Sequence, residues 1–435
     1  MIYILGALAA AAIVGALMLV MRRWSDAFPL LAIFALPFRL PISTDGRTVN
    51  LLIPLYLVIA AGTLVQLVPQ WLNRRSHEAP RRRPIPLEWL LLGAVVLYAL
   101  QAIYSPDHTK AAENIAFFYI PFGLLFVLLR DVRWTRELIL KCVGIAVALA
   151  VVFAGIGFVE YYRKTLFLNP KVIASDQYGN YFRVNSLFFD PNIYGRFLAI
   201  VMIAVTTVVL WAHHRREVLI GAGVLAWLLA GLITSFSQSS IAALLLGMTV
   251  LAAYRWDARA SLYVAGALLA IVVVVVLAAP PSLHFGLKGS GGSTSNATSG
   301  RTKLISGGLE LFADRPLYGY GSGSFETEYK RHGNASAANA TSASHTIPIT
   351  VAAEQGVIGL AVYFALLVAA FATLFRGAGR SPARIALVAC FAALVLHTWT
   401  YADFLEDPIT WTLLGVGVAL ARWPAGGDPD SCATT

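Results

Sequence analysis

A succession of long apolar runs is the feature that most limits how this chain can fold. Runs such as residues 2–21 and 261–280 reach the roughly 20 residues that a helix needs to cross about 30 Å of hydrocarbon. Of the 435 residues, 58% are hydrophobic and 13% are charged, a composition far from that of soluble domains. The sequence therefore predicts an integral membrane protein.

Reading these runs in order gives 12 to 13 candidate transmembrane helices. The second run contains Pro29, Pro37 and Arg39, and the last run is short, so the number stays open between the two values. The expected fold is an all-α polytopic membrane protein. The candidate spans lie near residues 2–21, 27–42, 48–72, 87–104, 114–129, 138–161, 192–211, 217–233, 239–254, 261–280, 350–375, 383–400 and 409–422.

Short arginine-rich turns between these runs predict the orientation of the chain. They alternate with turns on the other side that carry few charges, and the positive-inside rule places them in the cytoplasm. We expect transmembrane helices over residues 1–279 with an external loop at 162–191, then a large external loop over 280–349 that contains short amphipathic helices. Further helices follow over 350–422, and the tail at 423–435 is cytoplasmic.

Charge and cysteine content argue against two other classes of protein. The formal net charge is +10, but the basic residues are scattered between apolar spans and form no basic domain, so we expect no nucleic-acid partner. Cys142, Cys390 and Cys432 show no CxxC spacing and no nearby histidine cluster. A disulfide framework and a zinc site are therefore not expected.

A polar stretch over residues 280–345 interrupts the apolar runs. A membrane protein tolerates that much polar sequence only outside the hydrocarbon or around a wet cavity, which makes this stretch the first place to look for chemistry. Within it, residues 304–314 have helical apolar spacing and acidic side chains. That pattern favours a short amphipathic helix lying along the membrane surface.

The first group of candidate functional residues is the segment RVNSLFFDPNIYGR, Arg183–Arg196. Asp190 before a proline suits the start of a helix, with Asn192 just inside it. One interpretation is a capped helix whose two arginines meet lipid head groups. The other is an anion site made by Arg183, Arg196, Asn192 and the helix N-terminus, because guanidinium groups and exposed amides bind phosphate oxygens.

The second group combines Arg301, Lys303 and Arg315 with the turn PLYGYGSGSF at 316–325, which contains Tyr318. Glycines at alternate positions allow backbone conformations that other residues avoid, and close approach to a ligand. Their spacing is not a nucleotide-binding fingerprint. Taken alone, such a turn is more often a loop breaker, so its functional interpretation depends on the residues around it.

The third group is His345, at the start of an apolar span, with Glu354 deeper in the same span. A histidine at the membrane face can accept a proton from a hydroxyl at neutral pH, although a single histidine is more often satisfied by water. A carboxylate within an apolar helix is costly and usually faces a partner or a cavity. Glu354 is therefore a candidate to orient the imidazole or to hydrogen-bond a sugar.

Two further polar segments have weaker functional interpretations. His397 stands with Asp403, Glu406 and Asp407 in an acidic corner, read most simply as a solvated turn and otherwise as a contact for a cation or sugar. The run TSFSQSS at 234–240 either caps two helices or hydrogen-bonds a glycan or pyrophosphate. A metal site would need more converging ligands than the sequence shows, and we expect no metal or other cofactor.

The order of these motifs resembles the O-antigen ligase and polymerase superfamily of bacterial envelopes. The matching motifs are R-x-x-S-x-F-x-x-P-N at 183–192, S-G-R at 299–301, D-R-P-L-Y-G-Y-G-S-G-S-F at 314–325, and S-H-T with A-E-Q-G-V-I-G-L within 344–360. The resemblance covers roughly residues 180–365 by motif and the whole chain by topology. It implies serial transmembrane helices, like those of GT-C glycosyltransferases, with one large periplasmic loop between late helices.

The resemblance also implies a reaction and its residues. Members move a glycan from an undecaprenyl-pyrophosphate carrier to an acceptor hydroxyl, without metal, at the periplasmic face of the inner membrane. By motif, Arg183 and Arg301 correspond to the arginines that stabilise the pyrophosphate, and His345 corresponds to the general base. The sequence departs from the family at Thr346, where an asparagine is common. Direct displacement of the pyrophosphate would invert the configuration of the sugar.

Two other classes of function compete with a glycosyltransferase. A transporter or flippase of lipid-linked glycans would distribute charged residues through several mid-membrane spans, whereas the candidate polar residues gather at one face. An envelope scaffold would have no use for His345 above an intramembrane Glu354. The expected partners are a polyprenyl-pyrophosphate-linked glycan, a glycan or lipid-glycan acceptor, and membrane lipids.

Overall fold

The computed structural model describes residues 2–44, 47–69, 84–168, 182–256, 301–333 and 344–422, together with the isolated positions 259, 263 and 266. Several predictions fall outside these residues. They are the span at 261–280, the first part of the large external loop, much of the loop at 162–191, and the tail at 423–435.

Helices build most of the described chain. They are α1 (Ile2–Arg23), α2 (Ala27–Ala35), α3 (Ile53–Gly62) with the π-helical turn η1 (Thr63–Leu67), α5 (Pro86–Ala102), α6 (His108–Asn114), η3 (Ile115–Tyr119), α7 (Ile120–Arg130), α8 (Arg136–Arg163), α10 (Pro191–Leu210), α11 (Arg215–Thr234), α12 (Gln238–Arg255), α15 (Arg301–Asp314), α16 (Phe325–Arg331), α17 (Ile347–Phe375), the 3₁₀ turn η5 (Ala378–Arg380), α18 (Pro382–Trp399) and α19 (Pro408–Arg422).

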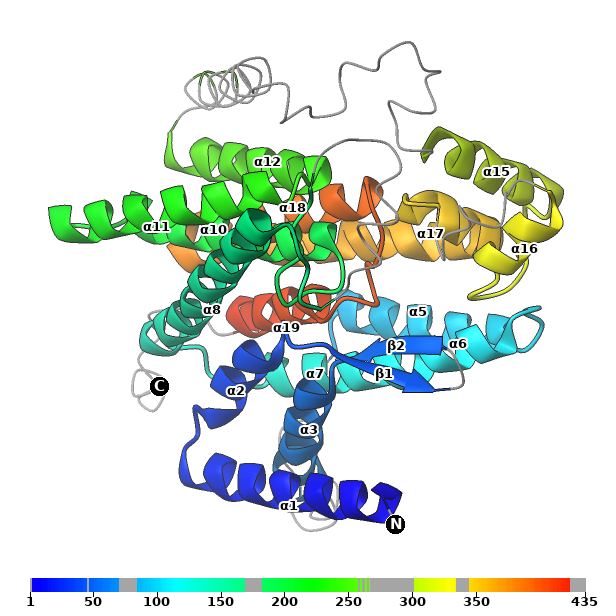
Figure 1. The fold of residues 1–435 in the computed structure, drawn as a ribbon, viewed down its shortest axis with the longest axis horizontal. Coiled ribbons are helices and arrows are strands. Elements are labelled where there is room, and N and C mark those ends of the chain that lie inside the picture. The colour runs from blue at the N-terminus through cyan, green and yellow to red at the C-terminus, as the bar shows by residue number, and fades with distance from the viewer. Residues whose placement is uncertain are drawn as a thin grey trace, which may run out of the picture.

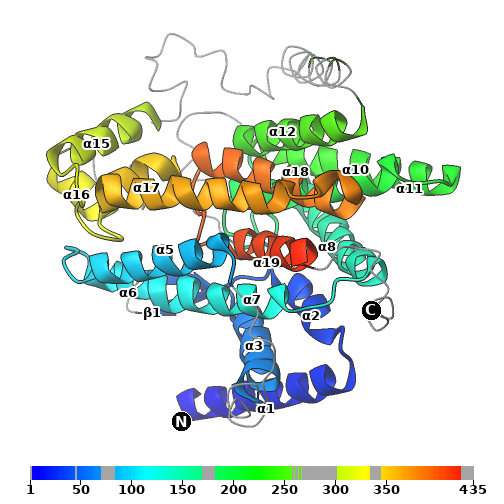
Figure 2. The same ribbon diagram turned by 180° about the vertical axis from the view of Figure 1, so that it is seen from behind.

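Most of the long helices lie roughly side by side in layers (Figure 1). The layer of α10, α11, α12, α17 and α18 lies over the layer of α5, α7 and α19, while α8 runs obliquely and α3 crosses between α1 and the rest (Figures 1 and 2). The main pairs in contact are α12 with α18, α7 with α19, α10 with α11, and α5 with α17. Their apolar side chains form the core that the hydrophobic runs predict.

Seven of the described helical segments are long and apolar enough to cross a membrane. Three shorter apolar helices, at Ile53–Leu67, Pro86–Ala102 and Pro408–Arg422, add to them. Each of these ten segments lies at a span expected from the sequence, which confirms a polytopic helical membrane protein. The total of 12 to 13 transmembrane helices stays a prediction.

The run at 27–42 and the start of the run at 48–72 differ from the helices expected there. Helix α2 ends at Ala35, and β1 (Leu40–Thr44) and β2 (Arg47–Leu51) form an antiparallel hairpin in which Thr44 pairs with Arg47. The chain is therefore not purely α-helical. The sequence explains the exception, because prolines end the apolar run and an Asp-Gly pair, typical of two-residue hairpin turns, separates the two strands.

Several helices begin next to a polar side chain that caps their N-terminus. Asp190 caps α10, with its carboxylate accepting a hydrogen bond from the backbone N–H of Asn192 at 2.6 Å and with proline at the first helical position. Thr135 and Ser237 cap α8 and α12 in the same way. Capping satisfies backbone donors that a helix end leaves free.

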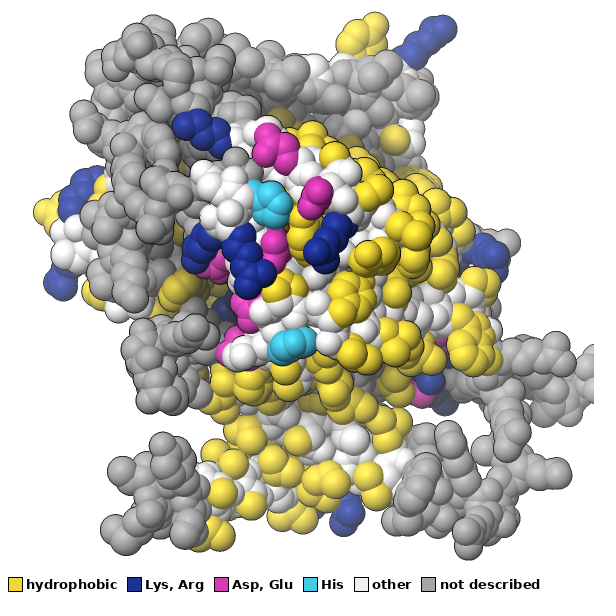
Figure 3. Space-filling model, turned by 90° about the vertical axis from the view of Figure 1, so that its right-hand side faces the viewer, with side chains coloured by type: hydrophobic (Ala, Val, Ile, Leu, Met, Phe, Trp, Pro, Cys, Tyr) yellow, Lys and Arg dark blue, Asp and Glu magenta, His cyan; other side chains and the backbone are white. Residues whose placement is uncertain are grey.

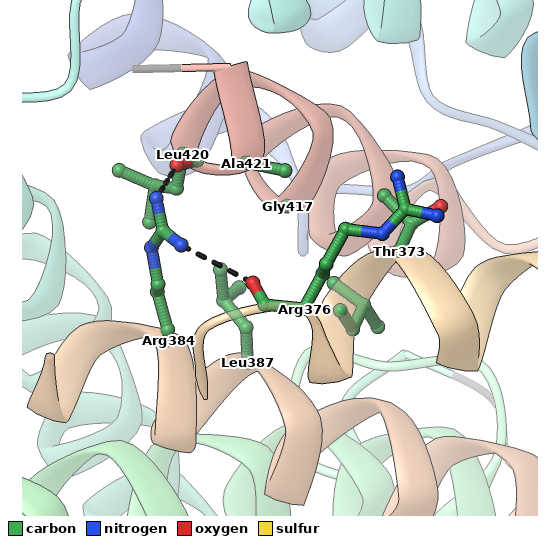
Figure 4. Close-up of a pocket in the computed structure, with 8 residues that line it drawn as sticks. Thr373, Arg376, Arg384, Leu387, Gly417, Leu420 and Ala421 are labelled. Carbon is green, nitrogen blue, oxygen red and sulfur yellow. Dashed lines mark hydrogen bonds between the residues drawn. The ribbon is translucent and has the colours of Figure 1, made fainter. Parts of the chain in front are cut away.

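One end of the bundle is held together by arginines from turns that the sequence places in the cytoplasm. Arg130, at the end of α7, and Arg422, at the end of α19, both pair with the buried carboxylate of Glu88 in α5. Arg384 donates hydrogen bonds to the carbonyls of Arg376 and Leu420 (Figure 4). Four helices thus meet at one end, as the alternation of basic turns predicts.

Replacing Glu88 with alanine should destabilise the bundle. Arg130 and Arg422 would lose the carboxylate that joins their helices, and an unpaired group at a partly buried site costs about 1–3 kcal/mol. We expect a lower midpoint of thermal unfolding for Glu88→Ala in detergent. Glu137→Ala is the control, because this exposed carboxylate pairs with Lys141 on its own helix and joins no second helix among the described ion pairs of α8, and it should leave the midpoint unchanged. Equal midpoints for the two variants would contradict the role of Glu88.

Candidate functional site

Helix α17 is broken at Gly356, and the glycine-rich segment 316–321 fills the break. Gly356 has φ 65° and ψ −163°, a conformation outside the helical range. The segment replaces the missing helical hydrogen bonds: the N–H of Val357 donates to the carbonyl of Pro316 at 2.8 Å, and the N–H of Gly321 donates to the carbonyl of Glu354 at 2.7 Å. The large loop is therefore fixed to the membrane helix at this point.

The glycines of this segment allow contact between backbones. A Cβ atom on Gly319 would lie 2.4 Å from the carbonyl of Glu354, and one on Gly321 would lie 2.6 Å from the Cα of Ser105. Both glycines have positive φ, as does Gly356. We expected such glycines to admit a ligand, but in the structure the groups that approach them are the backbones of α17 and of the chain after α5.

Glu354 fixes the far end of the same segment. Its carboxylate accepts hydrogen bonds from the backbone N–H groups of Gly323 at 2.9 Å and Phe325 at 3.0 Å, where α16 begins. The side chain is buried and also lines a cavity. Glu354 thus holds the loop through these two hydrogen bonds. A contact between Glu354 and a sugar would involve the part of the carboxylate that lines the cavity.

A cavity of about 830 Å³ lies between this loop, α5, α6, α17 and the turn at 401–406. Its volume is in the range of small-molecule sites, about 300–1,000 Å³. The end of the molecule that carries α15 and α16 gathers basic, acidic and histidine side chains beside a hydrophobic band (Figure 3). The ionisable residues that line the cavity are Arg39, Asp107, Lys110, Glu113, Asp190, Glu326, Lys330, His345, Glu354, Asp403 and Glu406, with Tyr98, Tyr119, Tyr363 and Tyr401.

His345 lies in the wall of this cavity with its backbone and ring both held. Its φ is 55°, which is uncommon for a residue with a side chain. The imidazole stacks on the ring of Tyr401, with ring centroids 5.4 Å apart and planes 29° from parallel. On its N-terminal side, the hydroxyl of Ser344 donates to the carbonyl of Thr346 at 2.8 Å. The contacts around it place the imidazole in one position at the start of α17.

Tyr401 connects His345 to the start of α10. Its hydroxyl lies near the carboxylate of Asp190, and its ring also meets His397 edge to face at 5.7 Å. Burial raises the pKa of Tyr401 well above its ordinary value, and the nearby carboxylates of Asp190 and Asp403 raise it further. Tyr401 therefore stays protonated and can donate its hydroxyl hydrogen to Asp190.

A buried polar network continues from Asp190 to the first candidate group. The guanidinium of Arg183 donates to the side-chain oxygen of Asn192 at 3.3 Å, and Ser237 donates to the same oxygen at 2.9 Å. Ser240 then contacts Ser237 at 2.7 Å and the imidazole Nε2 of His397 at 3.1 Å. The hydroxyls of the run at 234–240 thus lie inside the protein, where they join α12 to α10 and α18.

Arg196 is fully buried and holds the turn at 401–407. Its guanidinium pairs with Asp407 at 2.8 Å and donates to the carbonyls of Ala402 at 3.2 Å and Asp403 at 3.1 Å. The acidic corner is therefore not a solvated turn, since Asp407 and His397 are buried as well. Arg196 contacts protein groups in a place where we expected a phosphate contact.

Five predicted site residues do not line the cavity, namely Arg183, Asn192, Arg196, Arg315 and Tyr318. Arg315 is exposed and its guanidinium lies over the ring of Tyr320, 4.4 Å from the centroid. Tyr318 is 51% exposed and its carbonyl accepts a hydrogen bond from the hydroxyl of Tyr104 at 2.7 Å. Arg301 is the first residue of α15, and its side chain lies outside the described part of the structure.

Arg39, Lys110 and Tyr401 are among the cavity residues that were not predicted from the sequence. Arg39 follows α2 and approaches Asp403 closely enough to lower the pKa of its carboxyl, against the larger effect of burial. Lys110 stands in α6, and Tyr401 in the acidic corner. Arg39 could have been noticed in the sequence, because it is a charged residue among apolar and proline residues. The sequence alone did not show that it lies near the later loops.

No group of three or more His, Cys, Asp or Glu side chains is placed to hold a metal ion in the ranges that the structure describes.

Residues 223–364 match the family model described as O-antigen ligase. The resemblance to the O-antigen ligase and polymerase superfamily is confirmed. The matched segment contains His345, Glu354 and the glycine-rich loop, and it ends before the turn at 401–407. Among curated proteins, no sequence matches the chain. The family match and the apolar helices together support a multi-pass membrane enzyme of the O-antigen ligase type.

The break in α17 can be tested with a single methyl group. In Gly356→Ala the new Cβ would lie 2.5 Å from the carbonyl of Leu317, at a φ that side chains rarely adopt. Such backbone strain costs about 1–3 kcal/mol, so we expect a lower midpoint of thermal unfolding. Gly93→Ala in α5 is the control, because no atom lies within 4 Å of the added Cβ. An unchanged midpoint in Gly356→Ala would show that the loop is not held as described.

Proposed function

We propose that this protein is a membrane glycosyltransferase that moves a glycan from an undecaprenyl-pyrophosphate-type carrier to an acceptor hydroxyl. The observation that supports this most strongly is the position of His345. It lines a cavity of about 830 Å³, and it belongs to the segment that matches the O-antigen ligase family. The glycan donor, the glycan or lipid-glycan acceptor and the surrounding lipids are the partners that this function requires.

In the proposed reaction His345 acts as the general base. Its imidazole accepts the proton of the acceptor hydroxyl while the hydroxyl oxygen bonds to the anomeric carbon of the donor. The bond between that carbon and the carrier pyrophosphate breaks, and the pyrophosphate leaves with the electron pair. Attack opposite the leaving group inverts the anomeric configuration. Tyr401 supports this role, because its ring packs on the imidazole.

Arginines stabilise the leaving pyrophosphate in this proposal, without a metal. Guanidinium groups form strong paired hydrogen bonds with phosphate oxygens, and the developing charge is the largest electrostatic demand of the reaction. We assign this role to Arg183 and Arg301. Arg183 is half-buried and is joined through Asn192 to the start of α10, and the Asp190 cap of that helix touches Tyr401. Arg39 adds a guanidinium that lines the cavity itself.

The apolar part of the cavity supports a lipid-linked substrate. Ile347, Val351, Val362 and Leu366 line it along α17, and Phe118 lines it from η3. An isoprenoid chain would gain about 25 cal/mol for each Å² of apolar surface that it buries there. We place the site at the periplasmic face of a bacterial inner membrane, opposite the end where Arg130 and Arg422 meet Glu88.

Replacing His345 should abolish transfer. Loss of a general base lowers the rate about 100- to 10,000-fold, and the arginine substitutions Arg183→Ala and Arg301→Ala should have similar effects through the leaving group. The measurement is transfer of a radiolabelled glycan from its polyprenyl pyrophosphate by purified protein in proteoliposomes. His213→Ala and Arg215→Ala are matched controls, since His213 is exposed in the turn before α11 and Arg215 is exposed at the first position of α11.

Wild-type turnover by His345→Ala would refute its assignment as the base. A wild-type protein that moves the intact carrier-linked glycan across the bilayer, and never joins it to an acceptor, would favour a flippase. The same proteoliposomes report both outcomes, because a glycosidase added outside the vesicles cleaves only the glycan that has crossed the bilayer to that side.

Tyr401 should act as a positioning residue for His345. Tyr401→Phe keeps the stacked ring but loses the hydroxyl near Asp190, whereas Tyr401→Ala loses both the ring and the hydroxyl. Misplacing a catalytic group by about 1 Å costs roughly 100-fold in rate, so we expect a large fall in kcat for the alanine variant, a smaller fall for the phenylalanine variant, and little change in the KM of the donor. Tyr162→Ala, at an 89% exposed position, is the control. Equal kcat values for wild type and Tyr401→Ala would contradict this role.

A further inference from the structure

The wall of the cavity formed by α5, α6 and Glu406 has features that the transfer mechanism does not use. Asn114 is only 5% exposed and lines the cavity. Its side-chain NH₂ donates to the hydroxyl of Tyr98 at 2.8 Å and to Glu406 at 3.4 Å. Its side-chain oxygen has no hydrogen-bond partner among the described residues. Buried polar atoms normally have a partner, so this oxygen is a candidate acceptor for a ligand.

Charges near this wall are mostly negative. Asp107, Glu113, Glu354 and Glu406 line this side of the cavity, against the single cation Lys110. The other lysine of the lining, Lys330, already pairs with Glu326 at 2.6 Å, one turn away on α16. A phosphate group placed here would meet like charges. The pyrophosphate of the donor therefore fits the part of the cavity near Arg39 and His345, and the carboxylate-rich wall suits a different part of the substrates.

Sugar hydroxyls suit the chemistry of this wall. Carboxylate and amide oxygens accept hydrogen bonds from hydroxyls, and the adjacent rings of Tyr98 and Tyr119, with centroids 4.4 Å apart and planes tilted by 55°, add apolar surface. The carboxylates of Glu113 and Glu406 and the free side-chain oxygen of Asn114 can therefore accept hydrogen bonds from the hydroxyls of a sugar ring.

We propose that the wall of Asn114, Tyr98, Tyr119, Glu113 and Glu406 is the acceptor subsite, and that it takes a neutral sugar and excludes phosphorylated ones. This inference rests on the proposed glycosyl transfer, because the same cavity must bring the acceptor hydroxyl to His345. All five residues of the wall lie outside the segment that matches the O-antigen ligase family. The acceptor preference would then be set by α5, α6, η3 and the turn that carries Glu406.

Direct binding of sugars tests this subsite. The wild-type protein in lipid nanodiscs is mixed with methyl glycosides of glucose, galactose, mannose and N-acetylglucosamine, or with the 6-phosphates of the same sugars, and binding is followed by saturation-transfer NMR. We expect a signal from at least one neutral glycoside and at least a tenfold weaker signal from its 6-phosphate. Asn114→Leu should reduce the neutral signal at least tenfold, and Glu406→Gln should reduce the preference against the phosphate.

Glu137→Gln, on the exposed surface of α8, is the control and should bind as wild type does. Glu406→Gln is nearly isosteric, so it tests the wall even where Asn114→Leu does not fold. Equal signals from neutral and phosphorylated sugars, no signal from any neutral glycoside, or wild-type binding in both variants would overturn the subsite. Transfer measured in parallel separates the two proposals: sugar binding without glycosyl transfer refutes the transferase, whereas transfer with unchanged binding in the variants refutes the subsite.

Discussion

The contact between the glycine-rich segment 316–321 and the break in α17 is the interaction on which the candidate site depends. A helix interrupted at Gly356 leaves backbone groups that must find partners, and the segment supplies them through Pro316 and Gly321. Glu354 then accepts the first amides of α16. These bonds fix the loop over the end of α5 and close one side of the cavity, so the position of the loop follows from backbone hydrogen bonding and needs no bound ligand.

The sequence predicts the helices well because their signal is local. Apolar runs, an Asp-Pro helix start and alternating basic turns each depend on a few neighbouring residues, and the structure has helices at all the described spans except around the hairpin of β1 and β2. The family motifs likewise identified His345 and the loop that carries it. The partners of these residues were harder to predict. Arg196 meets Asp407 more than 200 positions away in the chain, and no local pattern distinguishes an arginine that binds an aspartate from one that binds a phosphate.

The buried network around Tyr401 shows the same limit for the site. Asp190, His345 and His397 come from three separate segments, and each touches Tyr401. In the sequence, Tyr401 is one aromatic residue in an acidic corner that reads as a solvated turn. Its importance depends on the packing of α18 against α10 and α12, which brings that corner into the protein interior. The glycine-rich turn shows the same limit, since positive φ and small size serve contact with another backbone as well as approach to a ligand.

The distribution of charge in the cavity constrains how two substrates can share it. A pyrophosphate carries several negative charges and requires guanidinium groups, while the lining contains more carboxylates than cations. In the proposed reaction the donor pyrophosphate therefore belongs at the end of the cavity that Arg39 lines. The carboxylates beside Asn114 would repel a second anion but accept sugar hydroxyls. Because His345 and Glu406 line the same cavity, an acceptor held on that wall can present a hydroxyl to the imidazole without entering the space of the pyrophosphate. Separation of the two substrates by charge would then also set the direction from which the hydroxyl attacks.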